Sequence, residues 1–120
     1  ALPISLEQFL QRARELEPIH FDEVMSIIAE HYRYTPSSFT NGLGDGGVVN
    51  PIEKNEGSCK LLAFAGLHQL NVEQTLNLFG DYYHQEVLDD PLGSSHANIR
   101  AFMRSGWEGV VFDTIPLLAN

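Results

Sequence analysis

The stretch NEGSCKLLAFAGLHQL, residues 55–70, is the most apolar part of the chain and contains its single cysteine. From Cys59 to Leu70, apolar or small residues cover nearly the whole circumference of a helix, a pattern typical of a helix that is buried on all sides. Ser58 suits the N-cap position of such a helix. The stretch therefore predicts a central helix around which the rest of the chain packs.

Two amphipathic helices are expected before this central one. Ser5 and Gln8 form a capping-box pattern, and the first helix should end before Pro18. The acidic residue Asp22 suits the start of the second helix, which should run to about Tyr32. Apolar residues recur at helical spacing in both segments: Leu6, Phe9, Leu10, Ala13, Leu16, Phe21, Val24, Met25 and Ile28.

Two further helices are expected after the central one. Asn71 and Gln74 form a second cap pattern, and the fourth helix should run from there to near Asp90 and Pro91. Ser95 suits the N-cap of a fifth helix, and Gly106 follows its end in the position that favours a left-handed residue. The inward faces are expected to comprise Val72, Leu76, Phe79, Tyr83, Val87, Ile99, Phe102 and Met103.

Three segments do not fit a helix. Residues 33–39 favour an extended edge strand, because Pro36 excludes a central one. The glycine-rich residues 41–51 predict a loop, which is either irregular or closes a small β-hairpin. Residues 109–120 predict a short extended piece over the core. The chain is therefore expected to be mainly α, a single domain over residues 1–120 with about five helices.

Composition limits the function classes. The 120 residues include 16 acidic and seven basic ones, and the net charge of −9 disfavours nucleic acid and anionic membranes as partners. One cysteine cannot form an internal disulfide, and no long apolar run or basic leader is evident. We expect a soluble, cytoplasmic protein. The chain has no CxxC, HxxxH or HExxH motif, so we expect neither a metal nor another cofactor.

Cys59 supports two interpretations. A thiol in the first turn of a helix has its pKa lowered by the helix dipole, and Lys60 acts in the same direction, so Cys59 could serve as a nucleophile. Free cysteine is also among the most frequently buried residues, and this helix is strongly apolar, which favours an unreactive thiol. A base for the first interpretation could be His84 or His96.

A cationic ridge is expected on the fifth helix. His96, Arg100 and Arg104 are spaced by four residues, which places them on one face. Such a ridge could receive a carboxylate or phosphate from a partner. Ordinary solvation, with favourable charge near the C-terminus of a helix, is the preferred interpretation.

Four strings together resemble a known family: YRYTPSSFTNG (32–42), NEGSCKLLAFAGLHQL (55–70), TLNLFGDYYHQEVL (75–88) and HANIRAFMRSGWEGVVF (96–112). In this order they are similar to the HopJ (HopPmaJ-like) type III effector family, over about residues 21–112. The resemblance implies a protein delivered by a type III secretion system, if the chain is a true effector. The resemblance does not assign catalytic residues, because none is established for the family.

The polar positions shared with this family predict one site, formed by the starts of the third and fifth helices. They are Asn55, Ser58, Lys60, His96, Asn98 and Arg100. The first hypothesis is a binding module for a protein or a small anionic ligand, with Asn55, Ser58, Lys60 and Arg100 as its contacts. The alternative is a cysteine-dependent hydrolase or transferase, in which Cys59 is the nucleophile, His96 the base and Asn98 or Asn55 the orienting or oxyanion-binding group.

Overall fold

The central helix is present as α3, Glu56–Leu67, in the computed structural model of the protein, which describes residues 2–120. Its side chains Leu61, Leu62 and Phe64 are fully buried. The expectation of a core helix around Cys59 is confirmed. Its N-cap differs, however, because the helix begins after Asn55 and Ser58 lies inside the first turn.

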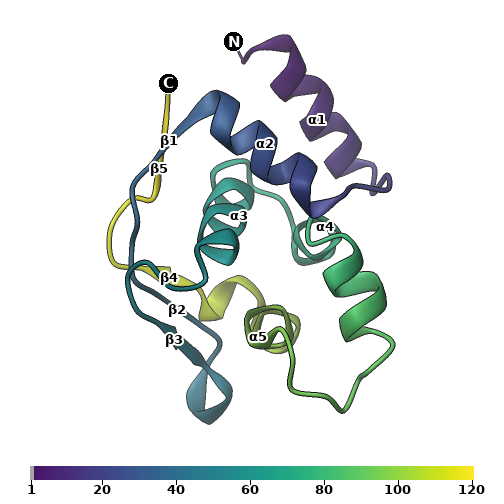
Figure 1. Ribbon diagram of the computed structural model, residues 1–120, viewed down its shortest axis with the longest axis vertical. Helices are drawn as coiled ribbons and strands as arrows, with labels where there is room; N and C mark the ends of the chain where they lie inside the picture. Colours follow the sequence, from purple (N-terminus) through teal and green to yellow (C-terminus); the bar gives the residue numbers. More distant parts are fainter. Residues whose placement is uncertain (1) are drawn as a thin grey trace.

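The other helices surround α3, as Figure 1 shows. α1 and α2 lie above it in this view, α4 and the following π-helix lie to the right, and α5 lies below. The bounds are α1 Ile4–Arg14, α2 Phe21–His31, α4 Val72–Asn77, η2 Tyr82–Val87, α5 Ala97–Ser105 and η3 Gly106–Gly109. The predicted mainly helical fold is therefore confirmed. Within residues 2–120, no helix combines the length and the apolarity needed to cross a membrane.

The predicted caps agree with the structure at α4 and differ at α1 and α5, as at α3. At α4, the Asn71 side chain accepts from the Gln74 backbone at 2.8 Å, and the Gln74 side chain accepts from the Asn71 backbone at 2.9 Å. At α1, the N-cap is Pro3, and Ser5 lies inside the helix with its hydroxyl 3.0 Å from the His31 ring. α5 begins after His96 and not after Ser95.

The fourth helix is interrupted, although the sequence predicted it as continuous. α4 ends at Asn77, and Gly80 has a left-handed φ of 61° before the chain resumes as the π-helix η2. A Cβ at Gly80 would lie 3.0 Å from the carbonyl oxygen of Ile19 and from the backbone nitrogen of Phe21. The close approach of this chain segment to the start of α2 thus requires glycine and breaks the helix.

Three large apolar residues that were expected on buried faces are exposed. Leu67, near the end of α3, is 52% exposed, so the central helix is not buried on all sides along its whole length. Leu16 follows α1 with a left-handed φ of 58° and is 41% exposed. Met103 on α5 is also 41% exposed. Leu16 lies outside α1, which ends at Arg14, so helical spacing does not apply to it, whereas Met103 lies within α5.

Two small antiparallel sheets complete the fold. β1 (Tyr32–Tyr34) pairs with β5 (Leu117–Ala119), while β2 (Phe39–Asn41) pairs with both β3 (Val48–Asn50) and β4 (Val111–Phe112). The glycine-rich segment closes the β2–β3 hairpin through the short helix η1, Gly44–Gly46. The single edge strand expected over residues 33–39 is wrong: Tyr34 ends β1, Phe39 begins β2, which is the middle strand of its sheet, and Pro36 lies between the two strands. The expected extended tail is present and supplies a strand to each sheet.

Candidate functional site

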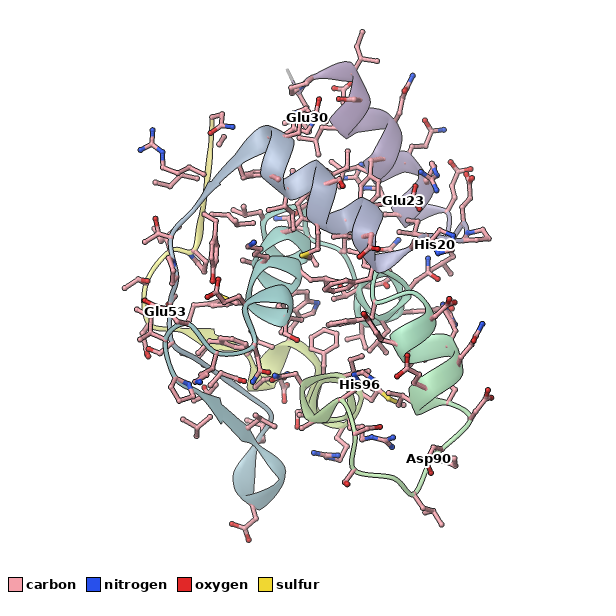
Figure 2. The ribbon with its side chains drawn as sticks, viewed as in Figure 1. His20, Glu23, Glu30, Glu53, Asp90 and His96 are labelled. Atoms are coloured by element: carbon pink, nitrogen blue, oxygen red, sulfur yellow. The ribbon has the colours of Figure 1, made fainter. Side chains whose placement is uncertain are left out.

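A cavity of about 370 Å³ lies between the first turns of α3 and α5. Figure 2 shows His96 at the start of α5 and Asp90 in the loop that precedes this helix. The lining residues come from both helix starts and from the α2 and α4–η2 region: Phe21, Asn55, Gly57, Ser58, Phe79, Tyr82, His96, Ala97, Asn98 and Ile99. The cavity therefore brings together four of the predicted site residues: Asn55, Ser58, His96 and Asn98.

Both helices begin in an unusual way. Asn55 and His96 precede α3 and α5 with left-handed φ values of 53° and 52°, whereas an ordinary N-cap residue is extended. Neither side chain accepts a hydrogen bond from the first turn of its own helix. Because first-turn N–H groups have no carbonyl four residues earlier in the helix, backbone donors of Gly57, Ser58 and Ala97 remain for another acceptor.

Gly57 allows an aromatic ring to approach the start of α3. A Cβ at this position would lie 2.8 Å from Cζ of Phe21. The Phe21 ring in turn stacks on Phe79 with centroids 6.3 Å apart and meets Tyr82 edge-on at 5.3 Å. One side of the cavity is therefore aromatic, and the helix starts form its polar side.

A cluster of asparagine side chains joins the two helix starts to the hairpin, and all of its members except Asn55 are buried. We call Asn41, Asn50, Asn55 and Asn98 the amide cluster. Asn50 and Asn98 exchange two hydrogen bonds, at 2.9 and 3.0 Å, and Asn55 donates to Asn50 at 2.7 Å. Asn41 donates to the backbone and side-chain oxygens of Asn98 at 2.8 and 3.1 Å. The hairpin residue Asn50 thus holds one residue from each helix start.

His96 is held by two residues that sequence reasoning missed. Its Nε2 lies 2.9 Å from Oε1 of Glu86, and its ring lies 5.2 Å from the Tyr82 ring. Both partners belong to the π-helix η2. Helical spacing alone did not single them out, because a π-helix changes which residues share a face.

A second cavity with acidic walls adjoins the first one. Phe21 and Tyr82 also line an adjoining cavity of about 240 Å³, whose walls include Asp22, Asp81 and Glu86. Phe21 and Tyr82 are therefore shared between the cavity lined by the helix starts and the cavity lined by carboxylates.

Two predicted ligand contacts do not line the cavity. Arg100 is 9% exposed and donates to the carbonyl oxygens of Ser95 and Asp90, so it holds the loop before α5. Lys60 points its Nζ at the Tyr34 ring, 4.7 Å from the centroid, which is a cation–π contact. The cationic ridge is also not free, because Arg104 donates to the carbonyl of Gly46 at 2.8 Å.

Cys59 lies beneath the site and is not among the cavity residues. Its side chain is 1% exposed, and Sγ lies 3.8 Å from the carbonyl oxygen of Ser37. Burial raises the pKa of the thiol and outweighs the opposing effects of the Ser37 and Tyr34 hydrogen bonds and the Lys60 charge. The preferred interpretation of Cys59 as a buried thiol agrees with this environment.

Comparison with known proteins gives the chain a family. The family model for the HopJ type III effector protein matches residues 6–117. Among solved structures, the crystal structure of an unknown function protein, VPA0580, is 40% identical, with a TM-score of 0.90 over 100% of this chain and 98% of that chain. No curated protein matches. Because the family model covers nearly the whole sequence, this chain belongs to the HopJ type III effector protein family.

Proposed function

We propose that this chain is a binding module whose cavity between α3 and α5 holds one carboxylate group, carried by a small ligand or by a partner protein. The observation that supports this proposal is the convergence of two helix starts on one cavity. The lining residues include Gly57 and Ser58 from α3, and Ala97 and Asn98 from α5.

The physical basis is the charge distribution of a helix. Each N-terminus carries a partial positive charge, and a negative group there gains roughly 0.3–1 kcal/mol, or up to about 2 kcal/mol in partly buried geometry. α3 and α5 have 12 and nine residues, so both helices are long enough to contribute. An oxyanion between them would accept hydrogen bonds from backbone donors of both first turns.

The carboxylates of the adjoining cavity favour a ligand group that carries a single negative charge. Asp22, Asp81 and Glu86 lie around the adjoining cavity, and no lysine or arginine lines the main cavity among residues 2–120. A phosphate ester would be repelled by these carboxylates without a cation to compensate. A carboxylate carries less charge and needs only the donors at the helix starts.

The cysteine-dependent alternative fits the geometry less well. His96 and Asn98 line the cavity, but Cys59 in the first turn of α3 is buried and does not line it, and its pKa is raised. A nucleophilic thiol needs an accessible sulfur and a stabilised thiolate. Binding at the cavity requires no movement of Cys59.

Titration of the ¹⁵N-labelled protein with sodium acetate and with sodium phosphate, at constant ionic strength, tests the proposal. Acetate should shift the amide resonances of Gly57, Ser58, Ala97 and Asn98 in a saturable manner, and phosphate should bind more weakly. Ser58→Asp places a carboxylate at the start of α3 and should abolish the acetate response. Ser26→Asp, on the exposed face of α2, is the matched control.

Two results would refute this function. One is the absence of saturable shifts at the two helix starts with acetate. The other is equal acetate binding by Ser58→Asp and the unmodified protein. Either result would show that the converging helix ends do not form an anion site.

Membership of the HopJ family also supports delivery by a type III secretion system. A translocation reporter fused to the C-terminus of the complete protein would test this proposal. The signal should require a functional type III apparatus, and a signal that persists in an apparatus-deficient strain would contradict it.

A further inference from the structure

A second, apolar depression lies away from the polar cavity. We call it the α3 groove. It runs between the second half of α3 and the segment that leads from β4 to β5, and its volume is about 510 Å³. Its lining comprises Leu62, Ala63, Gly66, Leu67, Phe112, Asp113, Thr114, Ile115, Pro116 and Leu117. None of these residues lines the polar cavity.

The floor of the groove is buried, and its walls carry exposed apolar side chains. Leu62, Ala63 and Leu117 are buried in the core and form the floor. Leu67 and Ile115 are 52% and 68% exposed and stand on opposite walls. Large apolar side chains on both walls of one depression are a feature of surfaces that meet a partner.

Gly66 is the least expected residue of the groove. Glycine weakens a helix relative to alanine, and no positive φ at Gly66 calls for it. The left-handed residue at this helix end is Gln69, with φ of 56°. A Cβ at Gly66 would meet the Trp107 ring at 3.5 and 3.6 Å, which is ordinary contact. Alanine would therefore fit, so packing within the chain does not require glycine at this position of the groove.

The negative charge of the groove lining and of the whole chain favours a basic partner. Asp113 is the charged residue of its lining, and its carboxylate accepts a hydrogen bond from the Ser38 hydroxyl. In the described part of the chain, no lysine, arginine or histidine lines the groove. With a net charge of −9, the chain attracts a basic partner and repels an acidic one.

We propose that the α3 groove docks a basic, amphipathic segment of a partner protein, which places an apolar side chain over Gly66 between Leu67 and Ile115. The basic residues of this segment lie beside Asp113. This interaction is separate from carboxylate binding between α3 and α5, and neither requires the other.

A pair of synthetic 14-residue amphipathic helices tests the proposal, one built of leucine and lysine and the other of leucine and glutamate. The lysine peptide should shift the NMR resonances of Leu62, Gly66 and residues 113–117 of the ¹⁵N-labelled full chain. Its Kd should rise with salt. The glutamate peptide should leave these resonances unchanged.

Variants locate the contact. Leu67→Ser and Ile115→Ser should each raise the Kd of the lysine peptide at least tenfold. Both residues are exposed, so these variants should retain the fold. Leu92→Ser, at a residue that is 98% exposed and outside the groove, should bind as the unmodified chain does. The proposal is overturned if the shifts lie elsewhere, if Leu92→Ser weakens binding equally, or if the glutamate peptide binds as tightly.

Discussion

Replacing Asn98 with alanine tests the amide cluster that joins the two helix starts. The Asn98 side chain takes part in three hydrogen bonds, at 2.9, 3.0 and 3.1 Å, with Asn50 and Asn41. A buried hydrogen bond contributes roughly 1 kcal/mol net, so the substitution should lower the free energy of unfolding by about 3 kcal/mol. The total stability of a chain of this size is of order 10 kcal/mol, so the variant should still fold.

Urea denaturation of a double-mutant cycle measures the effect. Asn50→Ala and Asn98→Ala remove the same two exchanged hydrogen bonds, so the double variant should be about 2 kcal/mol more stable than the sum of the single effects predicts. Asn120→Ala is a matched control at an exposed residue, and its effect should add to that of Asn98→Ala within about 0.5 kcal/mol.

Additivity of Asn50→Ala and Asn98→Ala would refute this reasoning. It would mean that the two amides do not exchange hydrogen bonds in solution and that the hairpin does not hold the start of α5. An Asn98→Ala effect below about 0.5 kcal/mol, the range of ordinary surface substitutions, would have the same meaning.

Three further outcomes are expected. Iodoacetamide should not label Cys59 in the native protein but should label it in urea, because the thiol is buried with a raised pKa; equally fast labelling in both states would contradict this. Gly80→Ala should lower the free energy of unfolding by roughly 1–3 kcal/mol, because φ at this position is left-handed and a Cβ would meet backbone atoms. An unchanged midpoint of urea denaturation would contradict this expectation. Hydrogen bonds from the His20 backbone and from Arg12 lower the pKa of Glu23 below its ordinary 4.5. Its stabilising effect is thus present above pH 4.5 and lost as pH falls through the lowered pKa, so the stability difference between the protein and Glu23→Gln should disappear in acid; a difference independent of pH would be inconsistent.

The helical architecture followed from the sequence where a pattern had one interpretation. The apolar run that starts at Cys59 predicts a buried helix, and α3 lies at the centre with Leu61, Leu62 and Phe64 fully buried, although Leu67 near its end is exposed. The pair Asn71 and Gln74 has the chemistry of a capping box, and both hydrogen bonds form. Local residue chemistry was sufficient in these two cases.

Helix boundaries were predicted less well where tertiary contacts determine them. Ser58 and Ser95 have good N-cap side chains, yet α3 and α5 begin after Asn55 and His96. Both of these residues adopt left-handed backbone conformations that intrinsic propensity disfavours. The partners that hold them, Asn50 and Glu86, lie in other elements and are not evident from local sequence.

The candidate site was predicted in part. The starts of the third and fifth helices were expected to form one site, and the structure places Asn55, Ser58, His96 and Asn98 around one cavity. Arg100 could not be assigned correctly from helical spacing, because carbonyl oxygens of the preceding loop occupy its guanidinium. A charged residue on a helix face is free for a ligand only if no loop folds onto it.

The arrangement of the two sheets has a consequence for folding order. β1 and β2 come early in the chain, but their partners β5 and β4 are near its C-terminal end. Such non-local pairing raises contact order, which slows folding because long loops must close first. During synthesis on a ribosome, β1 and β2 would emerge well before β5 and β4, the C-terminal strands with which they pair. The N-terminal half is therefore expected to stay open to chaperones until synthesis is nearly finished.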